Sequence, residues 1–218
     1  MERTRAWTRA AGVAGLVLAS TSCGDVVRQG RAPVFLVIDL LQGARGGNSG
    51  TFSGTLQSDV VTLVTSPAPC SVTAPCPTTY SDSGQVILRI SPKDIGTPAA
   101  PAAPSTNNEV TITRYRVAYR RSDGRNTQGV DVPYAFDGAS TGTVPVGGTL
   151  TLGFELVRHV AKQEPPLAQL ATNPTIITTI ADVTFYGRDQ VGNQLNVTGS
   201  IQIDFGNFAD VVSSSESK

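Results

Sequence analysis

The stretch ADVTFYGRDQVGNQLNVTGSIQIDF, residues 181–205, decides the fold, because it holds two alternating apolar patterns around one turn. The alternating residues are Ala181, Val183 and Phe185 before the turn and Leu195, Val197, Ile201, Ile203 and Phe205 after it. A period of two is typical of a half-buried β-strand. Between them, Gly192 and Asn193 are residue types that tolerate the positive φ of tight turns. The stretch therefore predicts a β-hairpin.

Similar patterns precede the hairpin. In residues 109–124, Tyr115, Val117 and Tyr119 fall on one face, with three arginines on the other, and residues 149–159 alternate from Leu150 to Leu156. Residues 33–43 and 84–91 also have strand character, and residues 51–64 indicate one or two strands. No amphipathic helical pattern follows residue 22, apart from one turn expected within residues 162–174. The fold class expected is all-β, an antiparallel sandwich of seven to eight strands with long loops.

Two of these patterns carry a resemblance to a known family. The motif V-x-F-x-G-x-D-x-x-G, from Val183 to Gly192, resembles the F strand and F–G turn of fibronectin type III domains, and its RDQVGN turn is similar to that of bacterial immunoglobulin-like repeats. The motif I-x-x-Y-x-V-x-Y resembles the C strand of the same family and lies at Ile112, Tyr115, Val117 and Tyr119. The resemblance covers about half of the chain after residue 22 and implies an immunoglobulin-like sandwich. It implies no ligand, because such folds host many unrelated functions.

The chain departs from that family in three respects. Its one tryptophan is Trp7, so the core tryptophan of the family is missing. Ala181 stands where the tyrosine of the tyrosine corner is expected. The region is also nearly twice the usual length of about 100 residues, so long loops or additional strands are expected.

The first 22 residues have the three parts of an export signal. These parts are the basic residues Arg3, Arg5 and Arg9, the apolar residues 10–18 and the small residues 19–22. The apolar run is about half the roughly 20 residues that span a bilayer. The small residues before Cys23 resemble the lipobox of bacterial lipoproteins, which implies that Cys23 is acylated. Ser20 stands where the lipobox usually has Leu, and the alternative is ordinary cleavage that releases a secreted protein.

Cysteine usage fits export to an oxidising compartment. Cys70 and Cys76 lie close together in a proline-rich loop and are predicted to form a disulfide. Zinc is the alternative ligand for this pair, although two thiolates without nearby histidine make an incomplete site. The pairing leaves Cys23 over, and acylation explains the odd cysteine. The expected organisation is a signal peptide at 1–22, a lipidated tether at 23–32, a β-sandwich at 33–210 and a disordered tail at 211–218.

Charge and composition narrow the partners. Removing residues 1–22 takes away three of 17 basic residues and one of 17 acidic residues, which leaves a net charge near −2. This balance does not favour nucleic acid as a partner.

Residues 97–108 are rich in proline and alanine without a core pattern, and we expect an extended loop there.

Candidate catalytic residues are scarce. The only histidine, His159, follows a strand on the face of Glu155, and we expect an exposed residue rather than a base. No G-x-S-x-G, H-E-x-x-H, P-loop or dinucleotide motif is present. A glycosidase would need only two carboxylates, but the acidic residues are scattered. Oxygen ligands for calcium occur near the last hairpin, at Asp182, Asp189, Asn193, Asp204 and Asp210, but without a calcium-loop motif. We predict no catalytic residue, metal or cofactor.

Two features could contact a partner. Arg114, Arg116, Arg120 and Arg121 form the densest charge, either a patch for an anionic partner or a solvated strand face that discourages edge pairing. In the loop at residues 130–138, Tyr134 and Phe136 could contact a sugar or protein, or pack beneath the loop.

We therefore expect a non-enzymatic, lipid-anchored protein of a bacterial cell envelope, at the outer membrane or periplasmic face. Its domain would be a structural or interaction module for an envelope protein or polysaccharide, with the lipid as its membrane contact. A carbohydrate-binding module, anchored or secreted, is the first alternative, and a carboxylate-based hydrolase is the second.

Overall fold

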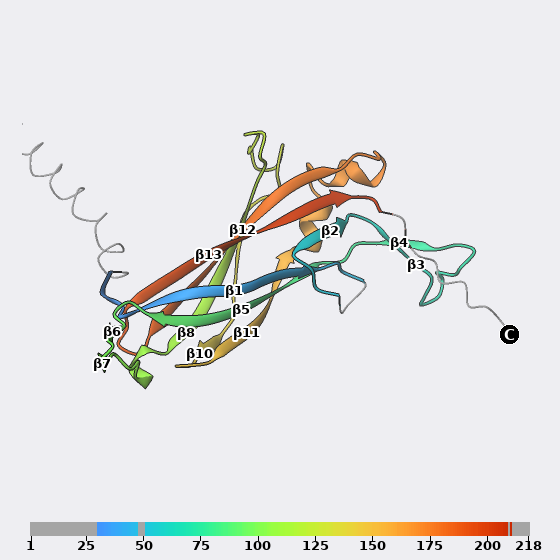
Figure 1. Ribbon diagram of the computed structural model, residues 1–218. Helices are drawn as coiled ribbons and strands as arrows, with labels where there is room; N and C mark the ends of the chain where they lie inside the picture. Colours follow the sequence, from blue (N-terminus) through green and yellow to red (C-terminus); the bar gives the residue numbers. More distant parts are fainter. Residues whose placement is uncertain (1–29, 48–50, 209, 211–218) are drawn as a thin grey trace, which may run out of the picture.

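The protein is mostly β, and two open sheets hold most of its strands (Figure 1). This computed structural model describes residues 30–47, 51–208 and 210. The smaller sheet has the order β1-β5-β11, with bounds Val34–Ala44, Asp82–Pro92 and Thr149–Val157. The larger sheet has the order β10-β8-β12-β13-β2, with bounds Gly142–Val144, Val110–Arg120, Ile177–Asp189, Gln194–Gly206 and Thr55–Asp59. A short strand, β9 (Phe136–Gly138), also pairs with β8.

The predicted hairpin is confirmed as β12 and β13, which pair antiparallel from Ile177↔Phe205 to Arg188↔Gln194. At the turn, the Gly192 N–H donates to the Asp189 carbonyl over 3.0 Å, and Gly192 has a φ of 93°. Asn193 does not take a positive φ. Its side-chain amide instead donates to the Asp189 carboxylate over 2.7 Å and closes the turn.

The alternation along β8 is also confirmed, with one interruption. Tyr115, Val117 and Tyr119 are buried, while Arg114, Arg116 and Arg120 on the opposite face are exposed. The pairing of β8 with β12 shifts register, so that Thr113 has no partner on β12. This β-bulge explains the three-residue spacing between Ile112 and Tyr115, because the extra residue returns Tyr115 to the core face.

The two sheets face each other across one hydrophobic core. Phe154 of β11 lies 5.2 Å from Tyr115 of β8 and 5.3 Å from Phe185 of β12, measured between ring centroids. The pair with Tyr115 is tilted and the pair with Phe185 is edge-to-face, and aromatic pairs of this kind contribute stability beyond the burial of their area. The Tyr119 hydroxyl donates to the Leu156 carbonyl over 2.7 Å inside the same core. The β8 tyrosines therefore join the sheets by packing and by hydrogen bonding.

Several details differ from the sequence-based expectation. The pairing is not wholly antiparallel, because β13 and β2 run parallel from Gln202↔Thr55 to Gly206↔Asp59. The two main sheets hold nine described strands rather than seven to eight, since β9 lies in the segment expected to be a loop and β10 in one for which no strand was predicted. Two small ribbons complete the strands: β3 (Thr62–Val64) with β4 (Cys76–Thr78), and β6 (Gly96–Thr97) with β7 (Ala100–Pro101).

The connecting segments contain short helical turns. The proline- and alanine-rich segment, expected to be an extended loop, forms β6, β7 and the 3₁₀ turn η1 (Thr106–Asn108). Helix α3 (His159–Lys162) follows β11, and the single turn expected near the later prolines is η2 (Ala168–Ala171). Within the described part of the chain, no helix has the length and apolar character needed to cross a membrane. The predicted signal at 1–22, most of the tether and the tail at 211–218 lie outside the described residues.

Candidate functional site

A shallow hollow lies on the polar face of the larger sheet, where β8, β12 and β13 meet. Its volume is about 200 Å³. It is lined by Thr113, Arg114, Tyr186, Gly187, Arg188, Gln194, Leu195 and Asn196. The β8 bulge lies beside Gly187, since Gly187 pairs with Ile112 immediately before the unpaired Thr113. The hollow therefore forms where the sheet departs from regular pairing.

Arg114 is held in a defined position at this hollow. Its guanidinium carbon lies 3.7 Å from the centroid of the Tyr186 ring, and its Nη1 donates to Asp137 Oδ1 over 3.0 Å. Stacking on an aromatic ring and one carboxylate contact restrict the guanidinium, which has five N–H donors in all. Donors therefore remain for a further acceptor.

Arg188 provides a second guanidinium, which no sequence pattern indicated. It is exposed, and within the described residues its side chain makes no hydrogen bond or ion pair. It pairs through its backbone with Gln194 across the hairpin, and the neighbouring Tyr186 pairs with Asn196. The hairpin register thus places the amide of Gln194 beside Arg188 and that of Asn196 beside Tyr186.

A second hollow, of about 160 Å³, adjoins the first and shares Leu195 and Asn196 with it. Its remaining lining comes from Val34, Phe35, Leu36 and Lys93. Phe35 is 56% exposed, and Lys93 Nζ lies 5.1 Å from the centroid of its ring. We call the two hollows together the β13 groove. It lies at the end of the molecule where β1 begins and where the β6–β7 ribbon lies (Figure 1).

The predicted arginine patch is exposed, but acidic residues balance much of its charge. Arg114 and Arg116 both pair with Asp137, and Arg120 pairs with Asp182 over 2.7 Å. Beyond β8, Arg121 and Arg125 share Asp123, and their hydrogen bonds lower the pKa of that carboxyl group. Exposed pairs of this kind add little stability. These acidic residues do reduce the positive electrostatic field that an anionic partner would meet at the patch. Arg188, which has no ion pair within the described residues, therefore attracts an anion more strongly than the paired arginines do.

The two residues of the predicted loop contact, Tyr134 and Phe136, differ in their exposure. Phe136 is only 8% exposed and packs edge-on against Tyr115, with Arg158 over its ring at 4.6 Å. It belongs to the core and is not accessible to a ligand. Tyr134 is 50% exposed and lies against Gly129. Only Tyr134 of this pair remains available for contact.

A buried ion pair lies where β5 begins, at the end of this strand away from the β13 groove. No sequence pattern predicted it. Lys162 Nζ lies 2.9 Å from Asp82 Oδ1 and also donates to the Asp59 carbonyl over 2.8 Å. Asp82 accepts further hydrogen bonds from the Gly46 N–H and the Ser58 hydroxyl. Burial raises the pKa of Asp82 and lowers that of Lys162. Lysine is rarely buried, so its residue type indicated an exposed position.

Neighbouring charges extend this network to the surface. Asp59 pairs with Arg45 and accepts the Phe208 N–H over 3.0 Å, while Asp210 accepts from the Leu63 N–H over 2.8 Å and contacts Arg45 at 3.4 Å. These bonds join β2, the end of β1 and the chain after β13. Since Asp82 and Lys162 are closed to solvent, the network holds elements together and offers no access to a substrate.

His159 lies beside Glu155 as the strand pattern predicted, with Ser81 between them. The Ser81 hydroxyl donates to Glu155 Oε1 over 2.6 Å and lies 3.3 Å from His159 Nδ1. The His159 backbone N–H donates to the same hydroxyl over 3.1 Å. In a catalytic triad the histidine lies between the hydroxyl and the carboxylate, so this order of contacts differs from a triad.

The carboxylates considered for calcium lie in separate networks. Asp182 binds Arg120 and Ser200, Asp189 closes the hairpin turn with Asn193, and Asp204 accepts from Thr178. In the described ranges, no three His, Cys, Asp or Glu residues are grouped so as to hold a metal ion.

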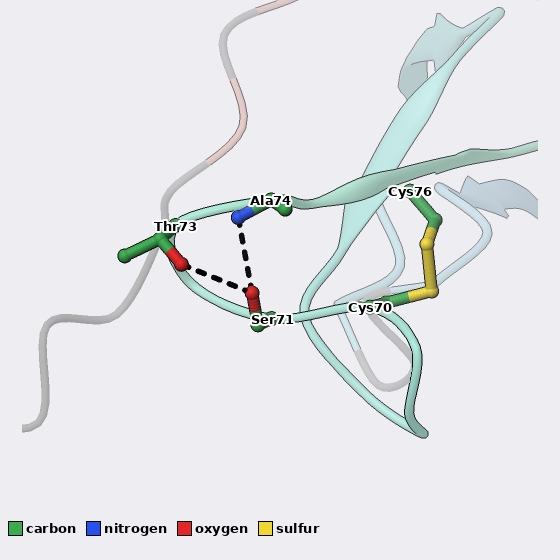
Figure 2. Close-up of a disulfide and its surroundings, with 5 residues drawn as sticks. All are labelled: Cys70, Ser71, Thr73, Ala74 and Cys76. Carbon is green, nitrogen blue, oxygen red and sulfur yellow. Dashed lines mark hydrogen bonds between the residues drawn. A yellow bond between two sulfur atoms is a disulfide. The ribbon is translucent and has the colours of Figure 1, made fainter.

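The predicted disulfide joins Cys70 to Cys76, with 5.3 Å between the two Cα atoms (Figure 2). Between the cysteines, the Ser71 hydroxyl accepts the Ala74 N–H over 3.0 Å and contacts the Thr73 hydroxyl. Val64 pairs with Cys76, so the disulfide closes the end of the β3–β4 ribbon. Disulfides of this kind are typical of proteins outside the reducing cytoplasm. Cys23 lies outside the described residues.

No protein-family model matches the chain, and no curated protein has a significantly similar sequence. A function for this chain must therefore follow from its own residues. Two features bear on it: the disulfide, which indicates the compartment, and the β13 groove, which brings exposed cationic, aromatic and amide side chains together.

Proposed function

We propose that this protein is exported, anchored by an acylated Cys23 to a bacterial cell envelope, and serves there as a non-catalytic structural or interaction module. The observation that carries the proposal is the pairing of Cys70 with Cys76, because it accounts for two of the three cysteines. The third directly follows a segment with the composition of an export signal. Acylation gives that residue a role consistent with the compartment.

The domain that performs this role is, in our proposal, an immunoglobulin-like sandwich. Two packed sheets, the interior strand β8 and the long hairpin support this assignment. The tyrosine that the family places in the F strand is absent, but Tyr119 bonds across the core to Leu156 and supplies a comparable link between the sheets. Such a domain is a rigid platform that can present a binding surface away from the membrane.

The partners proposed are the membrane, through the lipid, and an envelope protein or polysaccharide, through the exposed sheet face. That face of β12 and β13 is mostly polar, with cross-strand pairs such as Thr184 with Thr198 and Asp182 with Ser200. A polar, hydrogen-bonding face suits a contact that forms in water.

The test is the intact mass of the protein recovered from the membrane fraction of a bacterial host, beside a Cys23→Ala control. We expect an N-terminus at Cys23 that carries the mass of acyl chains, and a control that leaves the membrane fraction. A wild-type protein recovered unacylated from the medium would refute the anchor. The same sample, crosslinked before extraction, would capture the envelope partner.

A carbohydrate-binding module is the second candidate, and the β13 groove favours it. A groove with exposed aromatic and amide side chains matches the flat, hydroxyl-rich surface of a sugar chain better than the buried Phe136 does. A hydrolase lacks comparable support, since the two carboxylates buried most deeply, Asp59 and Asp82, are engaged in the ion network.

A further inference from the structure

We propose that the β13 groove binds an acidic polysaccharide, a sugar chain with carboxylate groups, and that Arg114 and Arg188 receive one of these carboxylates. The proposal rests on the second candidate function and names its site and ligand class. It moves the sugar contact from the loop of Tyr134 and Phe136 to the meeting point of β8, β12 and β13.

The charges around the first hollow select an anion. Arg188 is exposed and makes no ion pair within the described residues, and the Arg114 guanidinium is held on Tyr186 at 3.7 Å. A guanidinium matches a carboxylate through paired N–H donors. Among nearby carboxylates, Asp137 is bound to Arg114 and Arg116, and Asp189 is buried in the hairpin turn.

The second hollow extends the site along a chain. Phe35 presents an exposed ring next to the ammonium group of Lys93, and Leu195 and Asn196 connect this position to the first hollow. The C–H groups of a sugar ring can pack on the negative face of an aromatic ring. Each hollow thus combines an aromatic ring with a cation, and a polymer with a repeating acidic sugar matches that repetition.

The side chains that line the groove between the cations can form hydrogen bonds with the hydroxyl groups of a sugar. Gln194 and Asn196 each carry an amide that both donates and accepts, and Thr113 adds a hydroxyl that contacts the Tyr186 carbonyl at 3.4 Å. The groove is open and shallow, so it fits the side of a chain rather than an enclosed small molecule.

The experiment is calorimetric titration of the full chain, with its disulfide intact, with a hexamer of galacturonic acid. We expect binding that weakens as salt rises, and no binding of a neutral glucose hexamer. Arg188→Gln and Arg114→Gln should each weaken binding by about tenfold or more, since each removes charge-assisted hydrogen bonds. The matched control is Arg89→Gln, which removes an exposed arginine that pairs with Asp39 on the other sheet and should change affinity less than about twofold.

Defined outcomes would overturn the proposal. These are no binding of the acidic hexamer, equal binding of the neutral one, or equal losses in the Arg89→Gln control. Inorganic phosphate or a glutamate hexapeptide that binds more tightly than the sugar hexamer would assign the groove to a phosphoryl group or an acidic protein instead. An acylated protein that fails to bind the hexamer would leave the anchor standing and remove only the ligand.

Discussion

Lys162 Nζ lies 2.9 Å from Asp82 Oδ1, and the two side chains are 1% and 0% exposed. The pair lies at the end of β5 that meets Ala44, whereas the β13 groove lies at the end where Pro92 meets Val34. Burial opposes both charges, because it raises the pKa of Asp82 and lowers that of Lys162. Their mutual attraction and the hydrogen bonds of Asp82 offset that cost only while both partners are present.

The first prediction concerns this pair. Asp82→Asn leaves the Lys162 ammonium group buried without a counter-charge. Lys162→Met likewise leaves the Asp82 carboxylate buried without one. Each single change should lower the free energy of unfolding by about 3–5 kcal/mol, as measured by urea denaturation. The double variant removes both charges and should lose less than the sum of the two singles. Additive losses would show that the two charges are not coupled.

The second prediction concerns Tyr119. Leu156 has no register partner on β5, since Glu155 pairs with Ser83 and Val157 with Asp82. The Tyr119 hydroxyl donates to its carbonyl over 2.7 Å in the core. Tyr119→Phe therefore leaves a buried acceptor unsatisfied and should lower the free energy of unfolding by about 1–3 kcal/mol.

The control for this change is Tyr134→Phe, because Tyr134 is 50% exposed. Its loss should stay within about 0.5 kcal/mol. If both tyrosine variants unfold at the same urea concentration as the wild type, the bond to Leu156 contributes nothing to stability.

Sequence patterns predicted those parts of the fold in which the type of a residue indicates directly whether it is buried, forms a turn or pairs with a cysteine. The alternation of Val183 and Phe185 requires a buried face, and Gly192 supplies the turn between β12 and β13. The disulfide was predictable because Cys70 and Cys76 lie near each other in the chain. The parallel pairing of β2 with β13 was not, since alternation specifies a face and not a neighbour.

The candidate site was less predictable than the fold. Arg114 was singled out for its charge, but its part in the groove depends on the Thr113 bulge and on the register that places Tyr186 beneath it. Arg188 is a single arginine next to a turn, and its significance arises from contacts between strands. Lys162 is buried, whereas a lysine in a short polar segment indicates an exposed side chain.

The third prediction concerns acid stability. Partial burial acts to raise the pKa of Asp182, but hydrogen bonds from Arg120 and Ser200 outweigh it and hold that pKa below its usual value of 3.8. The unfolded chain therefore binds this proton first as the pH falls. The stability contribution is present above pH 3.8 and is lost as the pH falls through the lower folded pKa.

Asp182→Asn should accordingly reduce the loss of stability between about pH 6 and about pH 3, by roughly 0.5 kcal/mol because the pair is partly exposed. Urea denaturation at both pH values measures this difference. Glu164→Gln removes an exposed carboxylate elsewhere and serves as the control. An unchanged acid dependence in Asp182→Asn would mean that Arg120 does not stabilise the carboxylate.

The fourth prediction concerns Gly84, which pairs with Phe154 across β5 and β11. A Cβ at this position would overlap the Phe154 ring, which also contacts Tyr115 and Phe185. Gly84→Ala should therefore displace the ring from the centre of the core and lower the free energy of unfolding by about 1–3 kcal/mol. Gly153→Ala, on the adjacent β11 position with no atom within 4 Å of an added Cβ, should be neutral or gain up to about 1 kcal/mol. Equal stability of the two variants would show that the Phe154 ring moves without cost and that its three-ring cluster does not depend on the space at Gly84.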